Sequence, residues 1–254
     1  KNTKLAGGQW FKVEPGPMAD SGEWTHQYGN AGNTTSSDEK LGGATQTDQL
    51  EVQWVGRPGA DFGIDRNPRM PAPLSSWGRL FHQGMNRMIA LDAYNGSALW
   101  SLEIPDLRRV NMPRDASNWC TDGKALFVAV KDRCWEIDAA NGHRKAAHSM
   151  PAPYSAETHD WGYVAQGGDL FFGSAVKKDS SYTAFFGGGM WYDKRVPQSA
   201  AKVCSDGVFA IGKTDGKVAW SHSGGAVLNP TISIRNNKVF FVESRNLEIL
   251  KQAT

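Results

Sequence analysis

Short runs rich in apolar residues, separated by turn residues, fill the stretch from Gly78 to Ser101. The runs cover residues 79–83, 88–92 and 98–101, with Asn86-Arg87 and Asn95-Gly96 between them. Asn-Gly between two apolar runs indicates a tight hairpin, because both central residues of a type I′ turn need positive φ. The pattern therefore predicts a meander of three antiparallel strands.

The same meander recurs along the chain at intervals of roughly 45 residues, and the last interval carries an insertion of about 25 residues. Its second strand has a phenylalanine in phase each time, at Phe81, Phe127, Phe171 and Phe240. The turn recurs independently at residues 92–96, 138–142 and 214–216. Trp100 and Trp220 follow it at equal offsets, although Ala146 replaces Trp in the middle repeat. Two signals in phase predict an all-β fold, a β-propeller of four-stranded antiparallel blades.

The turn and the tryptophan together, Asp-Ala-x-Asn-Gly-x-x-x-Trp, resemble the blade signature of the quinoprotein-like, or pyrroloquinoline quinone (PQQ)-repeat, β-propellers. In that family the tryptophan of the outer strand docks against the neighbouring blade. The resemblance extends roughly from Trp24 to Leu250. It implies the fold but not one activity, since the same repeat serves alcohol and sugar dehydrogenases and also cofactor-free scaffolds of bacterial outer-membrane assembly. It also implies a periplasmic or extracellular location.

The two ends of the repeat region look complementary. Residues 50–55 alternate apolar and polar side chains and include Trp54, which predicts an outer strand without inner strands before it. Residues 229–232, 238–242 and 247–250 predict three inner strands. A composite blade made from both ends would remove exposed sheet edges.

With whole blades expected within residues 70–104, 115–149 and 160–224, the count is about four. A closed four-bladed ring, half of an eight-bladed ring completed by a second copy or another chain, and a fragment of a larger ring all stay open. The half or fragment is favoured, because the relatives usually carry about eight blades. Residues 1–23 are interpreted as a linker or peripheral segment, and residues 24–254 as the blades.

Composition narrows the function classes. The chain has 254 residues, with 28 Lys and Arg against 26 Asp and Glu, so a formal charge of +2 does not suggest nucleic acid as a partner. No apolar run has the roughly 18 residues needed to span a bilayer. Three cysteines at irregular spacing imply no disulfide framework, and Cys120 and Cys134 are expected to be buried free thiols.

Candidate ligand-binding residues lie just before each innermost strand, where loops of successive blades converge on the channel mouth. These residues are Arg69, Arg114, Asp115, His159, Asp160 and Asn229. They form a polar funnel for a ligand or, alternatively, cap the strand starts and pair with each other. His159 and Asp160 are adjacent on a predicted strand and should point to opposite faces. His26, near the start of the repeats, is expected to be a hydrogen-bonded structural residue.

A quinone site would need more than this. In the dehydrogenases that the repeat resembles, a Glu, an Asn and an Asp surround calcium and the quinone, a Trp stacks on the ring, and adjacent cysteines often cover it. Asn118, Trp119, Asp160, Trp161 and Asn229 supply residue types of this kind, but they do not match the pattern residue by residue, and no Cys-Cys occurs. No metal site is predicted from ligand spacing, and no cofactor is evident. PQQ with calcium belongs only to the alternative function.

The insertion at residues 176–203 concentrates aromatic side chains around Gly187-Gly188-Gly189. They are Tyr182, Phe185, Phe186, Trp191 and Tyr192. Such a loop would cover a ligand, stack on a sugar or dock a partner protein, or else pack back on the propeller as a long hairpin.

The function predicted from the sequence is a non-catalytic ligand- or protein-binding scaffold module of a bacterial envelope or secreted protein. The alternative is a PQQ-dependent oxidoreductase that acts on an alcohol or sugar and whose site is completed by additional blades.

Overall fold

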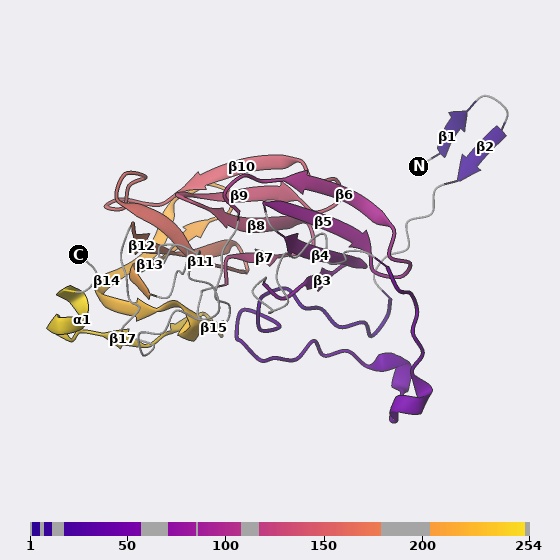
Figure 1. Ribbon diagram of the computed structural model, residues 1–254, viewed down its shortest axis with the longest axis horizontal. Coiled ribbons are helices and arrows are strands. Elements are labelled where there is room, and N and C mark those ends of the chain that lie inside the picture. Colours follow the sequence, from indigo (N-terminus) through magenta and orange to yellow (C-terminus); the bar gives the residue numbers. More distant parts are fainter. Residues whose placement is uncertain are drawn as a thin grey trace, which may run out of the picture.

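The computed structural model describes residues 2–5, 8–11, 18–56, 71–84, 86–107, 117–178 and 204–251. These residues are almost entirely strands and turns (Figure 1). A short hairpin of β1 (Asn2–Leu5) and β2 (Gly8–Phe11) comes first. Two single 3₁₀ turns follow, at Leu41–Gly43 and Thr47–Gln49.

The first blade is the meander predicted at the centre of the sequence. It consists of β3 (Leu74–Ser76), β4 (Arg79–Gly84), β5 (Arg87–Asp92) and β6 (Ala98–Glu103), paired in that order and antiparallel. Its β5–β6 turn is fixed by side chains, since Asp92 Oδ1 accepts hydrogen bonds from the backbone N–H groups of Tyr94 (2.8 Å) and Asn95 (3.2 Å). Gly96 has a φ of 71°, the conformation for which the turn needs glycine.

Two further blades repeat this order. The second contains β7 (Trp119–Thr121), β8 (Ala125–Val130), β9 (Arg133–Asp138) and β10 (Arg144–Ser149). The third contains β11 (His159–Gly167), β12 (Leu170–Lys177), β13 (Cys204–Gly212) and β14 (Val218–Leu228), with β17 (Glu243–Ser244) added as a fifth strand at the edge. The prediction of an all-β fold of four-stranded antiparallel blades is therefore confirmed.

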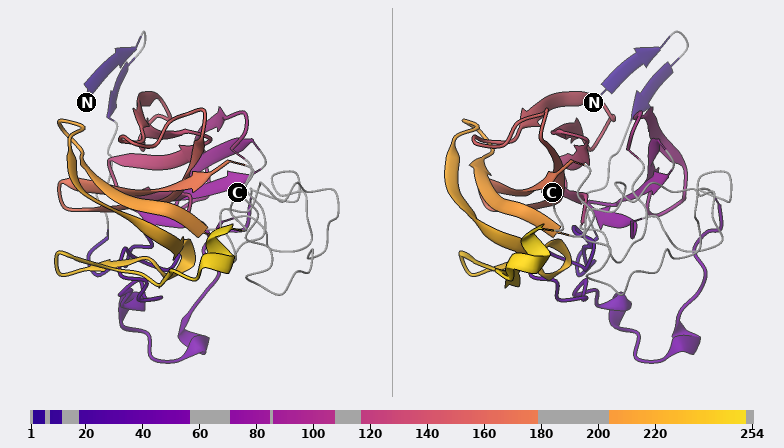
Figure 2. Two further views of the ribbon diagram at one scale, coloured as in Figure 1. Left: turned by 90° about the vertical axis from the view of Figure 1, so that its left-hand side faces the viewer. Right: turned by 60° about the vertical axis from the view of Figure 1, so that its left-hand side comes forward.

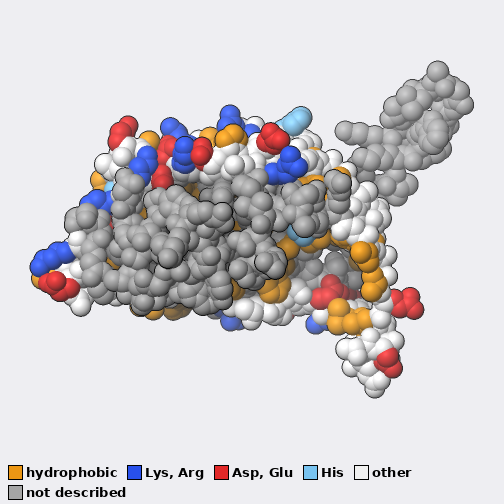
Figure 3. Space-filling model, viewed as in Figure 1, with side chains coloured by type: hydrophobic (Ala, Val, Ile, Leu, Met, Phe, Trp, Pro, Cys, Tyr) orange, Lys and Arg blue, Asp and Glu red, His pale blue; other side chains and the backbone are white. Residues whose placement is uncertain are grey.

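The blades pack face to face in succession, as the colour sequence from magenta to orange in Figure 2 shows. One apolar core lies between the first and second blades and includes Phe81 and Trp119. A second core, between the second and third blades, includes Phe127 and Phe209. Cys120 and Cys134 lie in this second core as free thiols, so that prediction is confirmed. Charged side chains gather along the outer edge of the molecule, where β6 and β10 run (Figure 3).

Tryptophans join neighbouring blades through one repeated contact. Trp54 donates its indole N–H to the carbonyl of Ala93 (2.9 Å), and Trp100 donates to Ala139 (3.0 Å). Each ring covers the glycine of the same turn, because a Cβ added to Gly96 or Gly142 would lie 2.5 Å or 2.8 Å from the ring. The tryptophan of the repeat therefore requires a glycine and an accepting carbonyl on the next blade.

The contact is missing between the second and third blades. Ala146 stands at the tryptophan position there, and a Cβ added to Gly216 of the third-blade turn would meet no atom within 4 Å. Lys213, just before this turn, joins the same two blades differently, since its Nζ lies 3.1 Å from Asp122 Oδ2. A polar bridge at that turn thus accompanies the loss of the aromatic contact.

The sequence register of the third blade was wrong by one residue. Phe81 pairs with Leu74 of the innermost strand, and Phe127 pairs with Cys120 in the same way. In the third blade the equivalent residue is Phe172, which pairs with Ala165 of the innermost strand. Its side chain lies in the core between the third blade and the β15–β16 hairpin. Phe171 faces backwards and stacks on Phe127, with ring centroids 5.8 Å apart. Because Phe171 and Phe172 are adjacent, the sequence pattern alone could not show which of them is equivalent to Phe81 and Phe127.

The fourth blade is only begun in the described residues. After a 3₁₀ turn at Asn229–Thr231, β15 (Ser233–Arg235) and β16 (Lys238–Phe240) form a two-stranded sheet. The chain then leaves this sheet, because the carbonyl of Val242 accepts a hydrogen bond from Leu228 N–H (2.9 Å) at the edge of the third blade.

Three strand predictions at the ends of the chain were therefore wrong. Residues 247–250 lie in a short helix, α1 (Leu247–Lys251), where Asn246 Oδ1 accepts from Glu248 N–H. Residues 229–232 lie mostly in the 3₁₀ turn. Pro230 favours the start of this turn over a strand, because proline has no N–H to donate to a neighbouring strand. Residues 50–55 form no strand, although Trp54 docks on the first blade. The described residues thus contain no composite blade and no closed ring.

A segment before the first blade contacts the innermost strands of the three blades and of the β15–β16 hairpin. Trp24 exchanges two backbone hydrogen bonds with Ser75 of β3 (2.8 and 2.9 Å). The carbonyl of Thr25 accepts from Thr121 of β7 (3.0 Å), and that of Ala31 accepts from Ile234 of β15 (2.7 Å). Between them, the side chain of His26 accepts a hydrogen bond from the backbone N–H of Gln166 in β11. Residues 24–31, which we call the axial segment, thereby hold the four innermost strands side by side.

Filling the missing tryptophan position should stabilise the protein. We expect Ala146→Trp to raise the free energy of unfolding by about 1–2 kcal/mol, because a ring over Gly216 would remove apolar surface from water. Trp100→Ala should lower it by roughly 3–5 kcal/mol. Urea unfolding measures both, and the gain should disappear when Gly216 is also changed to Asn. A destabilising Ala146→Trp, or a gain that persists without Gly216, would contradict the account of this contact.

Candidate functional site

Half of the predicted channel-mouth residues lie outside the described residues. Arg69, Arg114 and Asp115 belong to this group. So do all five aromatic residues of the insertion, Tyr182, Phe185, Phe186, Trp191 and Tyr192. Their assignment to a site stays a prediction, and the geometry of the mouth rests on His159, Asp160 and Asn229.

His159 joins two strands of the third blade. Its Nε2 lies 3.2 Å from Asp206 Oδ2 on β13, and its Nδ1 lies 2.8 Å from Thr158 Oγ1. The edge of its ring meets Tyr154 at 5.0 Å between centroids. Asp160, the next residue, has its Oδ1 3.9 Å from Lys178 Nζ. The adjacent side chains thus have different partners, and both help to hold the start of β11.

Asn229 lies in a separate, fully buried network of hydroxyl groups. Ser174 Oγ donates to Asn229 Oδ1 (3.0 Å), and Ser205 Oγ lies 2.6 Å from the same oxygen. The backbone N–H of Tyr163 donates to Ser174 Oγ (2.8 Å). Gly162 makes room for this network, because a Cβ there would lie 2.5 Å from Ser174 Oγ. Asn229 therefore ties the third blade to the turn that enters β15.

His26 is the hydrogen-bonded structural residue that the sequence predicted. It is buried, and its Nε2 accepts a hydrogen bond from the backbone N–H of Gln166 (3.2 Å). Its Nδ1 lies 2.8 Å from Thr25 Oγ1, so the neutral ring with the proton on Nδ1 satisfies both contacts. Burial lowers the pKa of His26 from 6.5 to about 3, and Lys213 adds to the effect by charge repulsion. His26 thus links the axial segment to β11 as a neutral imidazole.

The two tryptophans that the sequence offered for a quinone site are packed in the core of the protein. Trp119 is fully buried between the first two blades. Trp161 is buried as well, stacked 5.9 Å from Phe171 and donating its N–H to the carbonyl of Tyr163 (3.0 Å). Neither ring has a face open to a planar cofactor, and the residues that the structure describes contain no group of three His, Cys, Asp or Glu able to hold a metal ion. Trp119 and Trp161 are therefore not available to stack on a quinone.

One polar pair near these tryptophans keeps unused hydrogen-bonding atoms. Asn118 Nδ2 donates to Gln83 Oε1 (2.9 Å) across the first and second blades. Asn118 Oδ1 and Gln83 Nε2 are buried without a hydrogen-bond partner, a state that typically costs about 1–3 kcal/mol per group. Asn118 lies just before β7, in the region where the sequence placed the mouth, and Gln83 lies near the end of β4.

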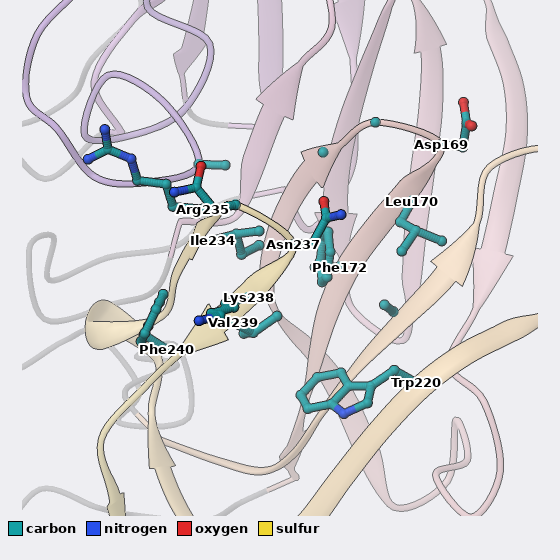
Figure 4. Close-up of a pocket in the computed structure, with 15 residues that line it drawn as sticks. Asp169, Leu170, Phe172, Trp220, Ile234, Arg235, Asn237, Lys238, Val239 and Phe240 are labelled. Atoms are coloured by element: carbon teal, nitrogen blue, oxygen red, sulfur yellow. The ribbon is translucent and has the colours of Figure 1, made fainter.

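An open groove lies between the third blade and the β15–β16 hairpin. Its volume is about 860 Å³, and Figure 4 shows Trp220 on one side and the β16 residues Lys238, Val239 and Phe240 on the other. Phe172 and Leu170 of β12 form its back wall. Trp220 is 38% exposed, whereas Trp100 at the equivalent position is 9% exposed.

The sequence reasoning did not identify this groove, although it held a signal. Trp220 follows its turn at the same offset as Trp100, so it should have been expected to need a turn on a following blade. Phe240 stands where Phe81 and Phe127 are buried, but it is 55% exposed. Among the described residues, the β15–β16 sheet beside these two aromatic side chains has two strands.

Comparison with known proteins gives similarity at the level of structure alone. No protein-family model and no curated protein matches the chain. A quinohemoprotein alcohol dehydrogenase from Comamonas testosteroni is similar in structure, with 12% identity, 82% of this chain and 28% of that chain covered, and a TM-score of 0.49. A europium-containing methanol dehydrogenase is 15% identical, with 67% of this chain and 36% of that chain covered and a TM-score of 0.44. BamB from Moraxella catarrhalis is 10% identical, with 61% of this chain and 44% of that chain covered and a TM-score of 0.38.

These structures include quinoprotein dehydrogenases, which the repeat resembles, and this chain spans less than half the length of each. Likeness at this level says nothing about activity, and the fold assignment rests on the sheet topology. No helix among the described residues is long and apolar enough to cross a membrane.

The buried neutral His26 should make stability depend on pH. Its pKa is lower in the folded chain, at about 3, than the ordinary value of 6.5, so between these pH values the unfolded chain binds a proton that the folded chain excludes. Stability should be complete above pH 6.5 and fall as the pH drops, by at most about 1.4 kcal/mol per pH unit.

Urea unfolding from pH 7 to pH 4 measures this slope, which should be smaller in His26→Gln and unchanged in the exposed His143→Gln control. An NMR titration of the His26 ring in the intact chain gives a direct readout. A ring that protonates near pH 6.5, or equal slopes in all three proteins, would show that His26 is not a buried neutral link.

Proposed function

We propose that the chain is a non-catalytic scaffold propeller module that binds another polypeptide at the apolar groove beside Trp220. The observation that supports this most is the state of Trp220. It stands where Trp54 and Trp100 dock on a following blade, yet it lies exposed in an apolar groove. Exposed aromatic surface in a shaped groove is the usual mark of a protein-binding site.

The polar candidates support the same proposal. His159, Asn229 and His26 each join strands or blades through hydrogen bonds that the fold needs. A general base or metal ligand must instead present an atom toward a substrate. The described polar residues thus serve architecture, and the groove is the feature suited to recognition. A periplasmic or extracellular location forms part of the proposal and follows from the family resemblance of the repeat.

A PQQ-dependent oxidoreductase is the alternative, and Asn118 with Gln83 is the observation in its favour. Their two unused polar atoms lie beside the channel end of the first two blades. A cofactor that paired with them would recover part of the cost of their burial. The buried faces of Trp119 and Trp161 oppose this alternative, since neither of these two indoles is open to stack on a quinone.

Adding PQQ and calcium to the full chain separates the two functions. We expect no change in melting temperature beyond that of calcium alone, and no dye-linked oxidation of alcohols or sugars. A ligand at 100 times its Kd would instead stabilise the fold by about 2.7 kcal/mol. A shift of that size that is lost in Asn118→Leu, together with substrate oxidation, would overturn the proposal of a non-catalytic module.

A further inference from the structure

Trp77 has a backbone conformation that is unfavourable for tryptophan. It occupies the first position of the two-residue turn between β3 and β4, where Trp77 and Gly78 have φ values of 52° and 70°. The same place holds Gly168 in the β11–β12 turn and Asn236 in the β15–β16 turn, both with positive φ. Glycine and asparagine accept this conformation readily, whereas a bulky side chain is strained in it. Strain of this kind often marks a functional residue.

The indole of Trp77 is only partly covered by the protein. Its five-membered ring lies against the second blade, since a Cβ added to Gly123 would be 2.6 Å from Cδ1 and from Nε1. Trp77 is nevertheless 47% exposed, so this contact leaves much of the indole open to solvent. Among aromatic side chains, the face of tryptophan attracts cations most strongly.

A carboxylate is fixed beside Trp77 by the same turn. Glu23 Oε1 accepts hydrogen bonds from Ser76 Oγ (2.8 Å) and from the backbone N–H of Trp77 (3.3 Å). Glu23 is exposed, and no cation among the described residues forms an ion pair with it. The two hydrogen bonds therefore hold a charged group in place before a ligand arrives, which lowers the entropy cost of binding.

The chain around Glu23 is acidic. The backbone N–H of Gly22 donates to Glu39 Oε2 (2.7 Å), and this bond together with one from Leu41 lowers the pKa of Glu39, which stays charged. Lys124, next to Gly123, adds one opposing charge. Residues 18–56 contain Asp20, Glu23, Asp38, Glu39, Asp48 and Glu51 against Lys40 alone, although the whole chain has a formal charge of +2. The segment thus favours a cationic partner.

We propose that Trp77 and Glu23 bind the guanidinium group of an arginine in a basic segment of a partner polypeptide. The planar cation stacks on the open part of the indole and donates a hydrogen bond to Glu23 Oε2. A guanidinium suits this site better than an ammonium group, because it is planar, weakly hydrated and carries several N–H donors in one plane. Neighbouring basic residues of the partner then face the other carboxylates of residues 18–56. The site shares no residue with the groove beside Trp220, so the inference goes beyond the proposed function.

An NMR titration of the full chain with an arginine peptide tests this site. The probe is the peptide Gly-Arg-Gly-Arg-Gly with both ends blocked, and the readout is the backbone N–H signals of Gly78 and Gly123, which every variant keeps. We expect saturable shifts at low salt that weaken as salt is added. The same peptide with citrulline, which has the shape of arginine without its charge, should leave both signals unchanged.

Glu23→Gln and its controls test the carboxylate. Glutamine keeps an oxygen that accepts from Ser76 and Trp77 but has no charge, so it should weaken binding by about fivefold or more. Asp48→Asn removes another carboxylate of the same segment, and Trp220→Ala changes the groove. Each of these two controls should change the affinity by less than about twofold. A failed titration would therefore refute this site and leave the proposed function of the groove untouched.

Trp77→Asn distinguishes a ligand-binding tryptophan from one that serves packing on Gly123. Asparagine already occupies this place at Asn236, so the variant should relieve the strain and keep or raise the melting temperature. It should also weaken binding of the arginine peptide by about fivefold or more. The proposal is overturned by a lower melting temperature of Trp77→Asn, by equal binding of the citrulline peptide, or by binding that Glu23→Gln leaves intact.

Discussion

The rest of the structure depends on the backbone hydrogen bonds of the axial segment. Blades of a propeller contact mainly their neighbours, whereas the axial segment contacts several of the described sheets. Trp24, Thr25, His26 and Ala31 meet the innermost strands of successive sheets at β3, β7, β11 and β15. His26 does so as a buried ring whose low pKa keeps it an acceptor. The segment thereby fixes the spacing of the sheets, and apolar side chains fill the cores between the blades.

At the outer edge the blades are joined by aromatic side chains over glycine. The indole–carbonyl contact is geometrically strict, because it needs a positive-φ turn, an accepting carbonyl and no Cβ. This strictness explains why the contact is either complete, as at Trp100, or absent, as at Ala146. It also distinguishes Trp220, which has the same place in its repeat as Trp100 but is 38% exposed and lines the groove.

The sequence predicted the blades because two local signals repeated in phase, the strand phenylalanine and the Asp-x-x-Asn-Gly turn. It failed where the decisive contacts were not local. Phe171 and Phe172 could be distinguished only by the core that each faces. Residues 247–250 alternate like a strand, but no partner strand holds them, and they form a helix. The groove escaped prediction because its lining residues, among them Phe172, Trp220 and Phe240, come from elements distant in sequence. The mouth residues in the described part are His159, Asp160 and Asn229, and they lie near strand starts. The hydrogen bonds of His159 to Asp206 and of Asn229 to Ser174 could not be predicted, because these partners are distant in sequence.

Hydrogen exchange of individual backbone amides tests the central role of the axial segment most directly. The N–H groups of Thr121, Gln166 and Ile234 belong to three different sheets, but all donate to this segment. The account predicts that they are protected to a similar degree and that weakening the segment by Thr25→Pro speeds the exchange of all three together. Exchange of these amides at the rate of exposed loops, or loss of protection in one sheet alone, would contradict it.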